Sequence, residues 1–535
     1  MSSTIAVERD ATADGEPAAP TASVRPASGG SRPPLAVLAI LLVAAAVRMG
    51  HLGSPPTDFH VTRQYNDVLL AHSFYTDVSG AGSARDKEIA RLDRPPILEP
   101  PILESATVGV DLLLGHETLV FPRLVSIWAW VLSGLTLFAI GRRLLGRVGA
   151  TVAVGAFELL PFMVVATRGF QPDPLAVAAM LVAVLAALRW SERPTGRRFV
   201  ALGAIAAGAI LVKADFAPFV IAGECAAVWI ATSGPVRARL RALFGWKQLV
   251  WLGVALLPSM IWTEFFFQSS LPLSVRINQY FIPDYLLHHA YWSNMWGELT
   301  AVFGVTVLVI AVAGFVLAKG PLRAVLVGAV AAYIVFMVAF DYRVATHSYY
   351  QLPAVPFVAL AVGHTVDVIV GVVRRWGFAP LVPRMLAAAT VAVVAVAVWR
   401  EDRLPSVAGG EAEVAAARTI GAALCRPMNA IWVDVAYGEV LDYHGDMAGM
   451  DWPLAADDAL TRLQGQSVPS AQERLAQDRS AGARYVVSTT PLTGGMPPDL
   501  AQQLQRFPVV LEGKAFEVWD LDPGAPSPCQ PGGPG

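Results

Sequence analysis

Residues 120–174 read VFPRLVSIWAWVLSGLTLFAIGRRLLGRVGATVAVGAFELLPFMVVATRGFQPDP, and this stretch alternates between apolar runs and charged loops. A run of roughly 20 apolar residues crosses the hydrocarbon core of a bilayer as a helix, because lipid offers the backbone no other hydrogen-bond partner. Two such runs, near 119–140 and 149–168, flank a loop whose cations are Arg142, Arg143 and Arg147. The stretch therefore predicts two membrane-spanning helices joined by a basic loop.

The basic loop recurs at every second connection between apolar runs. The intervening connections hold aromatic and acidic stretches instead. Cytoplasmic loops of membrane proteins collect Lys and Arg, so the alternation places the basic loops inside and the intervening loops outside. The further basic loops contain Arg189, Arg193, Arg197 and Arg198, then Arg237, Arg239, Arg241 and Lys247, then Lys319 and Arg323, and finally Arg374, Arg375 and Arg384.

The composition excludes a soluble multidomain protein. Of the 535 residues, 55% are hydrophobic and 15% are charged, and the net charge of −2 gives no indication of a nucleic-acid partner. We expect an α-helical polytopic protein of the plasma membrane with about eleven transmembrane helices, its N-terminus cytoplasmic and its C-terminus extracytoplasmic. The expected spans lie near 34–50, 119–140, 149–168, 174–190, 199–214, 216–232, 248–266, 299–318, 322–340, 350–373 and 384–399.

The chain divides into three predicted parts. Residues 1–33, rich in Ala, Pro, Gly and Ser, are expected to form a disordered cytoplasmic tail. Residues 34–400 form the membrane domain, with a first outer loop at 51–118 and a second at 267–298. The first loop predicts short helices with a polar break around 76–94. The second is aromatic and predicts one or two helices lying in the interface, or a simple aromatic belt.

Residues 401–535 are expected to form a small extracytoplasmic α/β domain. NAIWVDVA, ARYVVST and FPVVLEGKAFEVWDL predict strands, and EAEVAAARTIGAAL and AQERLAQD predict helices. No glycine-rich nucleotide fingerprint follows a strand, so no catalysis is assigned to this domain. Cys425 and Cys529 both fall outside the membrane, where disulfides persist, and we predict that they pair; two unpaired thiols are the alternative.

Polar residues concentrate directly after the first span, in PPTDFHVTRQYNDVLLAHSFY. A helix beginning near Asp58 would place Arg63 and Asp67 on one face, four residues apart. The simpler interpretation is a helix capped by Thr57 or Asp58 with a surface ion pair. The polar residues of this segment include Asp58, His60, Arg63, Gln64 and Asp67.

The later part of the first outer loop and three other outward connections add polar and ionisable residues at the same boundary. Ionisable groups there are expensive unless they have partners, so their convergence predicts a site, although Lys213 could snorkel and Arg168 could simply neutralise Asp173. Cations would hold a lipid phosphate or diphosphate, and a carboxylate would take the proton of an attacking hydroxyl. These residues are Glu99 and Glu104; Arg168, Gln171 and Asp173; Lys213 and Asp215; and Asp341, Arg343, His347, Tyr349 and Tyr350.

Taken together, these segments resemble the membrane glycosyltransferases with the C-type fold, over about residues 34–400. The most similar branch is that of protein O-mannosyltransferases and aminoarabinose transferases, glycosyltransferase family 39 and its bacterial relatives. The resemblance rests on the order and spacing of four segments: DFHVTRQYNDVLLAHSFY, EPPILESATVGVDLLLGHETLVFPRLVSIWAW, RGFQPDPLAVAAML and HSYYQLPAVPFVALAVG.

The resemblance implies an inverting transfer of a sugar from a polyprenyl-phosphate donor to an acceptor hydroxyl on a glycan, lipid or protein, at the outer face of the membrane. It implies that Asp58 activates the acceptor. A lysine precedes the Pro-Pro of the first loop in aminoarabinose transferases, whereas Glu99 stands here. The residues expected at the donor phosphate and sugar are Arg63, Gln64, Arg168, Asp173, Lys213 and Arg343, and those expected at the sugar or acceptor are His60, Asp67, Glu99, His347, Tyr349 and Tyr350.

Cofactors and rival functions complete the predictions. No cofactor is certain, but Asp58, Glu99 and Asp173 could hold a divalent cation, Mg²⁺ or Mn²⁺, between them. A transporter or flippase for a lipid-linked sugar is one rival, although such proteins carry their polar groups near the midplane. The other is a non-catalytic membrane scaffold whose C-terminal domain binds a partner.

Overall fold

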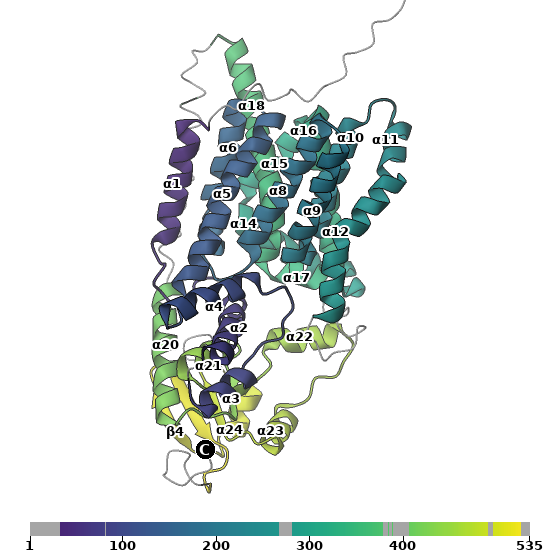
Figure 1. Cartoon of the computed structure of the whole chain (residues 1–535). Coiled ribbons are helices and arrows are strands. Elements are labelled where there is room, and N and C mark those ends of the chain that lie inside the picture. Colours follow the sequence, from purple (N-terminus) through teal and green to yellow (C-terminus); the bar gives the residue numbers. More distant parts are fainter. Residues whose placement is uncertain are drawn as a thin grey trace, which may run out of the picture.

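The structure is a computed structural model that describes residues 33–80, 82–266, 281–377, 406–489 and 496–525, together with Arg384 and Ala388. A helical bundle forms one part of the molecule, and a five-stranded sheet with its helices lies beyond one end of it (Figure 1). The bundle helices are α1 (Leu35–Met49), α5 (Val120–Leu144), α6 (Arg147–Leu159), α7 (Pro161–Ala166), α8 (Asp173–Glu192), α9 (Gly196–Val212), α10 (Ala217–Ala231), α12 (Trp246–Phe265), α15 (Val305–Leu317), α16 (Gly320–Ala339) and α18 (Val355–Arg375).

Within the described residues, six helices are long and apolar enough to cross a membrane, or up to seven if the bent pair of α14 (His289–Phe303) and α15 is one span. The chain is a multi-pass membrane protein, but the expected count of about eleven spans is not confirmed. The span expected near 149–168 is broken at Pro161, between α6 and α7. The span expected at 384–399 lies outside the described residues, apart from Arg384 and Ala388.

Small residues bring the bundle helices into close contact. A Cβ atom at Gly363 of α18 would collide with the carbonyl oxygen of Gly149 on α6, and one at Gly314 of α15 would collide with that of Ala361 on α18. Lipid tails are as apolar as leucine, so helices in a membrane associate through such close packing rather than through the hydrophobic effect. Glycine at these positions therefore sets the distance of α18 from both neighbours.

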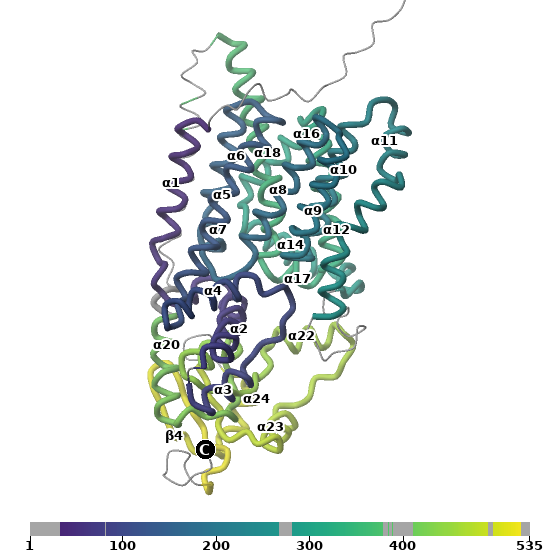
Figure 2. The backbone as a smooth tube through the Cα atoms, in the orientation of Figure 1, coloured from purple at the N-terminus to yellow at the C-terminus, as the bar shows by residue number. Residues whose placement is uncertain are grey.

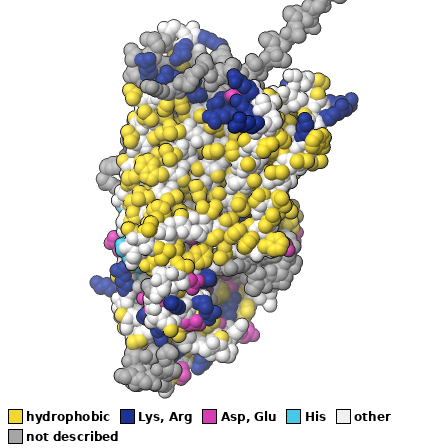
Figure 3. Space-filling view, viewed as in Figure 1, with side chains coloured by type: hydrophobic (Ala, Val, Ile, Leu, Met, Phe, Trp, Pro, Cys, Tyr) yellow, Lys and Arg dark blue, Asp and Glu magenta, His cyan; other side chains and the backbone are white. Residues whose placement is uncertain are grey.

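The basic loops gather at one end of the bundle. Lys and Arg side chains cluster there above a wide hydrophobic surface (Figure 3). Nε of Arg143, at the end of α5, donates to Oε1 of Glu192, at the end of α8, at 2.7 Å, which joins two of these loops. The basic loop between α10 and α12 contains α11 (Val236–Leu243), whose sequence VRARLRAL is strongly basic.

The first outer loop lies at the opposite end and contains α2 (Val61–Ser79), α3 (Ala84–Leu92) and α4 (Ile102–Leu114). The expected helix near Asp58 begins three residues later, at Val61. His60 precedes it in a left-handed conformation with φ of 38°, and no side chain caps the helix. The expected cap by Thr57 or Asp58 is therefore wrong, because the side chain of Asp58 is held by an arginine instead.

The second outer loop is described from residue 281 onward, because 267–280 lie outside the described residues. It forms the short helix η2 (Pro283–Leu287) and then α14. α14 and α15 meet at 92° across Gly304, whose φ of 72° and ψ of 147° only glycine adopts readily. Three short helices complete this end of the bundle: η1 (Ala214–Phe216), α17 (Asp341–Thr346) and η3 (Ser348–Ala354).

The C-terminal sheet has the strand order β2-β1-β3-β5-β4. β1 is parallel to β2 and β3, whereas β5 is antiparallel to β3 and β4. Helices cover both faces of the sheet, with one apolar cluster on each face. The strands are β1 (Ala430–Val433), β2 (Gly449–Asp451), β3 (Tyr485–Ser488), β4 (Val509–Gly513) and β5 (Phe516–Asp520), and the helices are α20 (Ser406–Ala423), α21 (Glu439–Gly445), α22 (Ala455–Leu463), α23 (Ala471–Ser480) and α24 (Pro498–Leu504).

The strands expected in this region are present as β1, β3 and the β4–β5 hairpin, and the two expected helices overlap α20 and α23. β2 was not predicted, because its three residues, Gly449–Asp451, are too few to show a periodicity. Cys425 is disulfide-bonded, but Cys529 lies outside the described residues, so their pairing stays a prediction. Cys225 is a free cysteine on α10.

The C-terminal domain is docked on the first outer loop, as the backbone trace also shows (Figure 2). Nδ2 of Asn66 donates to Oε1 of Glu439 at 2.5 Å, and the hydroxyl of Tyr65 lies 2.8 Å from Nε2 of His444. Burial lowers the pKa of His444 to about 4, so its neutral ring can accept a hydrogen bond from the Tyr65 hydroxyl. α2 therefore contacts the membrane domain and the C-terminal domain at once.

Candidate functional site

Four charged side chains from separate segments meet at the end of the bundle that carries the first outer loop. Nζ of Lys213 lies 3.1 Å from Oε1 of Glu99 and 3.3 Å from Oδ1 of Asp173. Nη2 of Arg63 lies 3.0 Å from Oε2 of Glu99 and 3.9 Å from Oδ2 of Asp173. Each carboxylate is thus shared by the same two cations, and we call Arg63, Glu99, Asp173 and Lys213 the charge cluster.

Local structure explains how each member reaches the charge cluster. Asp173 is the first residue of α8, where the positive end of the helix dipole favours a carboxylate. Lys213 ends α9 in an extended conformation, immediately before η1. Glu99 lies on the segment between α3 and α4, where the proline pairs of RPPILEPP hold the chain extended. Arg63 lies in the first turn of α2.

The charge cluster is buried on the membrane side and opens toward the outer loop. The side chains of Asp173 and Lys213 are 1% and 4% exposed, whereas those of Arg63 and Glu99 are 18% and 28% exposed. Burial would raise the pKa of Glu99, but Lys213 and Arg63 outweigh burial and lower it to about 2. Glu99 is therefore an anion held by two cations at the accessible side of the cluster.

A second group surrounds Asp58. Nε of Arg168 lies 2.7 Å from Oδ2 of Asp58, and Nη2 of Arg123 lies 3.8 Å from the same oxygen. Gln64 joins Asp58 to the segment between α7 and α8. Its Oε1 accepts from the backbone N–H of Phe170 at 3.0 Å, and its Nε2 lies 3.5 Å from Oδ1 of Asp58. Asp58 thus has its own cations, and Asp173 pairs with Lys213 and not with Arg168, as the simpler alternative had it.

Histidine and tyrosine side chains from the first outer loop and from η3 border the charge cluster. Nε2 of His60 lies 2.8 Å from Oγ of Ser348, and its ring centroid lies 5.0 Å from that of Tyr349. Nζ of Lys213 lies 6.0 Å from the centroid of the Tyr349 ring, and Nη1 of Arg343 lies 3.5 Å from Nε2 of His347. Burial lowers the pKa of His60 to about 4, although Asp173 opposes the shift. The rings of Tyr349 and Tyr350 lie next to each other, tilted by 38°, with centroids 4.9 Å apart.

The acidic residues of α2 and α4 lie behind Arg63. Oδ1 of Asp67 lies 3.7 Å from Nη1 of Arg63, so the expected pair on one helix face is present, with Asp67 buried and Arg63 partly exposed. Burial, with the neighbouring Glu104 and Glu99, raises the pKa of Asp67 well above its usual range despite Arg63. Asp341 does not join the cluster, because its carboxylate accepts from the backbone N–H of Ile282 at 2.8 Å.

Asp58, Glu99 and Asp173, which could have held a divalent cation, are not grouped around a common position. Within the residues that the structure describes, no group of three or more His, Cys, Asp or Glu side chains is placed to hold a metal ion. Asp58 faces Arg168, whereas Glu99 and Asp173 are joined by Lys213 and Arg63. Cations from the chain itself therefore occupy the positions between these carboxylates.

Two buried arginines near the site were not singled out from the sequence. Arg123, in the first turn of α5, donates to the backbone oxygens of Leu52, Ser54 and Arg168 at 2.7–3.0 Å. Arg48, at the end of α1, donates to Oγ1 of Thr167 at 2.8 Å and pairs with Glu158. An arginine inside an otherwise apolar run is the signal that would have identified both.

An apolar cavity of about 260 Å³ lies between α10, α14, α15, α16 and α18, and the exposed side chains of Val312 and Val330 line its open side. η1, which follows Lys213, leads into α10 and Phe219, and η3, which carries Tyr349 and Tyr350, leads into α18 and Phe357. The rings of Phe219 and Phe357 are stacked with centroids 6.0 Å apart. Both phenylalanines line the cavity, together with apolar residues of α14, α15 and α16.

Comparison with known proteins agrees with the resemblance expected from the sequence. Residues 99–262 match the model of the family described as dolichyl-phosphate-mannose-protein mannosyltransferase. The fold is that of ArnT from Cupriavidus metallidurans bound to undecaprenyl phosphate, at 15% identity and a TM-score of 0.52, covering 91% of this chain and 97% of that one. The apo state of the same ArnT gives a TM-score of 0.50 over 90% of this chain and 97% of that one, again at 15% identity.

A more distant solved structure is the oligosaccharyltransferase of Archaeoglobus fulgidus, at 12% identity and a TM-score of 0.46, covering 85% of this chain and 69% of that one. No curated protein matches the chain in sequence. The expected resemblance to membrane glycosyltransferases of the C-type fold is confirmed.

Proposed function

We propose that this protein is an inverting glycosyltransferase that moves a sugar from a polyprenyl-phosphate donor to an acceptor hydroxyl at the outer face of the membrane. The observation that carries the proposal is the bridging of one anion, the carboxylate of Glu99, by Nη2 of Arg63 and Nζ of Lys213 at 3.0 and 3.1 Å. The same two cations would hold a donor phosphate, because guanidinium and ammonium groups bind both kinds of anion.

The surroundings of the charge cluster suit both ends of such a donor. The apolar cavity of about 260 Å³ offers a place for part of a polyprenyl chain, while the phosphate stays at the boundary. ArnT, which shares the fold, has been solved with undecaprenyl phosphate bound. Tyr349, His60 and His347 lie beside Lys213 and would contact the sugar.

The chemistry follows from the charges. The acceptor oxygen attacks the anomeric carbon, its bond to the phosphate oxygen breaks, and the configuration inverts. Arg63 and Lys213 stabilise the negative charge that grows on the leaving phosphate, which is electrostatic preorganisation. Asp58 takes the acceptor proton, and Arg168, at 2.7 Å, holds that carboxylate in a fixed orientation.

The proposal is tested with the full chain in nanodiscs that contain polyprenyl-phosphate-linked sugars. Wild type is expected to transfer sugar to an added glycan or peptide hydroxyl, and Asp58→Asn is expected to lower the rate by about 10²–10⁴-fold, because that is the usual contribution of a general base. Donor binding should be retained in this variant. Asp284→Asn is the matched control, since Asp284 is an exposed acid of the second outer loop.

A thermal unfolding curve must accompany this measurement. Asp58→Asn leaves Arg168 and Arg123 with one buried counter-charge fewer, which usually costs about 3–5 kcal/mol. A folded Asp58→Asn protein that transfers sugar at the wild-type rate contradicts the assignment of Asp58. Translocation of the donor across vesicles, with the donor chemically unchanged by wild type, would instead identify a flippase.

A further inference from the structure

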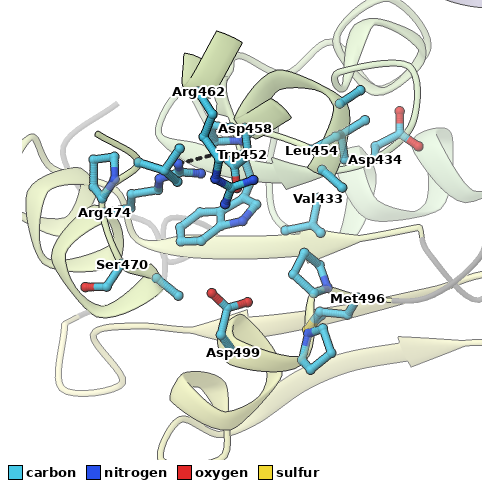
Figure 4. A pocket seen from close by; sticks show the side chains of 18 of the residues that line it. Val433, Asp434, Trp452, Leu454, Asp458, Arg462, Ser470, Arg474, Met496 and Asp499 are labelled. Atoms are coloured by element: carbon cyan, nitrogen blue, oxygen red, sulfur yellow. Dashed lines mark hydrogen bonds and ion pairs between the residues drawn. The ribbon is translucent and has the colours of Figure 1, made fainter. Parts of the chain in front are cut away.

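The C-terminal domain contains a wide crevice at the carboxyl ends of its parallel strands (Figure 4). Its volume is about 1070 Å³, and it is lined by Val433 and Asp434, which end β1, and by Trp452, which follows β2. The chain passes from β1 to β2 on one side and then returns across β1 to β3 on the other. The crevice therefore lies at the point where the strand order reverses, which is where open α/β sheets bind ligands.

The crevice offers hydrogen-bond donors and acceptors above the buried side chain of Trp452. Trp452 lies at its centre, with Arg462 on one side and Asp499 across from it (Figure 4). Nη2 of Arg474 pairs with Oδ1 of Asp458 at 2.5 Å. Within the part of the chain that the structure describes, neither Arg462 nor Asp499 forms an ion pair. Both residues are exposed. Oδ1 of Asp499 accepts from the backbone N–H of Leu500 at 3.0 Å, so Oδ2 of Asp499 and the guanidinium of Arg462 are the groups open to a ligand.

The charges of the crevice restrict the chemistry of its ligand. Two arginines line it against three aspartates, so a phosphate-rich or nucleic-acid ligand would gain no net attraction. The crevice opens at the ends of the strands and not along a sheet edge, so a peptide cannot add to the sheet as a further strand. A sugar chain fits instead, because each ring has apolar C–H faces for the exposed Pro469 and Pro498, and hydroxyls that both donate and accept.

The helix α22 lies between the crevice and the membrane domain. Asp458 and Arg462 face the crevice from one side of this helix. Leu460 and Leu463, on its other side, pack against the apolar core of the bundle. The hydroxyl of Tyr437 donates to Oδ1 of Asp457 at 2.9 Å and holds α22 to the end of β1. A ligand in the crevice is thus one helix away from the membrane domain.

We infer that this crevice binds an oligosaccharide, and that the oligosaccharide is the acceptor glycan of the transferase. The second half of the inference rests on the proposed function. The volume is at the upper end of small-molecule sites, which favours several linked sugars over one. Arg462 and Asp499 hydrogen-bond the hydroxyls of the chain from opposite walls, and its non-reducing or branching hydroxyl extends past α22 toward the charge cluster.

The experiment measures binding directly, by saturation-transfer difference NMR with the full chain in nanodiscs. The probes are linear di- to hexasaccharides of mannose, glucose, galactose and arabinose. At least one series is expected to bind wild type, with affinity rising with length. Arg462→Ala and Asp499→Ala are each expected to weaken binding at least tenfold. Lys514→Ala and Glu512→Ala are matched controls, since both change exposed charges on the β4–β5 hairpin, and they should leave binding unchanged.

The outcomes separate the crevice from the catalytic proposal. Binding lost in both crevice variants and kept in both controls supports the crevice, whether or not the protein transfers sugar. No binding by any probe, or binding that both crevice variants keep, overturns the inference. If transfer is detected, the crevice variants should raise the KM for the binding glycan at least tenfold, with kcat and the donor KM unchanged. An unchanged glycan KM would overturn the inference that the bound glycan is the acceptor, but not the inference that the crevice binds it.

Discussion

Glu99 lies between Arg63 and Lys213, the two cations that would hold a donor phosphate under the proposed function. Its two oxygens lie 3.1 Å from Nζ of Lys213 and 3.0 Å from Nη2 of Arg63, and its side chain is the most exposed of the charge cluster. The carboxylate compensates the two cations. Under the proposed function, a donor phosphate would displace it.

The first prediction concerns this competition. Glu99→Gln removes the competing anion, and we expect undecaprenyl phosphate to bind about tenfold more tightly, equivalent to about 1.4 kcal/mol. Native mass spectrometry or a titration in nanodiscs measures the affinity. Glu117→Gln is the control, since Glu117 lies on the same outer loop and pairs with His72 at 2.9 Å. Equal or weaker binding by Glu99→Gln would show that the carboxylate does not compete.

The second prediction concerns acid stability. Because the pKa of Glu99 is lowered from 4.5 to about 2 in the folded protein, the folded state binds fewer protons than the unfolded state between these values. The contribution of Glu99 is therefore complete above about pH 4.5 and is lost as the pH falls toward 2. The unfolding midpoints of wild type and Glu99→Gln, measured from pH 7 to pH 3, should converge below pH 4.5. A difference that stays constant with pH contradicts the ion pairing.

Among the elements, α2 contacts both the charge cluster and the C-terminal domain. Arg63 and Asp67 face the charge cluster, while Tyr65 and Asn66 contact α21 of the C-terminal domain. Nη2 of Arg85, on the following helix, donates to the backbone oxygens of Cys425 and Arg426. A shift of the C-terminal domain would therefore move Arg63, so the position of the charge cluster depends on the docking of that domain.

The right-angled joint between α14 and α15 gives the third prediction. Gly304 has a φ of 72°, and nothing lies within 4 Å of where its Cβ would be. Gly304→Ala should lower the free energy of unfolding by about 1–3 kcal/mol through backbone strain alone. Gly297 lies inside α14 with equally open space, so Gly297→Ala should be neutral or stabilise by about 0.5–1 kcal/mol. Thermal unfolding compares the two, and equal midpoints would exclude strain at Gly304.

At the scale of the whole molecule, the two ends of the bundle differ in charge and in attached structure. The basic loops gather at one end, and the charge cluster, the first outer loop and the C-terminal domain lie at the other (Figures 1 and 3). The positive-inside rule then predicts that the second end is extracytoplasmic. A polyprenyl-phosphate donor would have to present its sugar on that side.

The fourth prediction tests this orientation. Ser233 is exposed between α10 and α11 at the basic end, and Ser480 is exposed at the end of α23. A membrane-impermeant maleimide added to intact cells should label Ser480→Cys and should label Ser233→Cys only after permeabilisation. The unmodified chain gives the background from its own three cysteines. Labelling of Ser233→Cys in intact cells, with none of Ser480→Cys, would invert the orientation.

Hydropathy and charge periodicity were sufficient to predict the helical membrane domain, three of the strand segments and most residues of the charge cluster. These features are local. An apolar run forms a helix through hydrogen bonds within its own backbone, and a buried strand shows as a short apolar run bounded by turn residues. The span near 149–168 shows the limit, because one proline divides it into α6 and α7. The strand β2 shows another, since three residues contain no period.

The sequence by itself determined that cations and carboxylates converge at one boundary, because each polar segment interrupts an apolar run at the same end. Only the tertiary structure decided which charges pair: Arg168 with Asp58, Lys213 with Asp173, and Glu99 with both Lys213 and Arg63. The physical reason is that Coulomb attraction depends on distances in space between segments far apart in the chain, and helix packing sets those distances. The crevice beside Trp452 likewise exists only once β1, α22 and α24 are assembled.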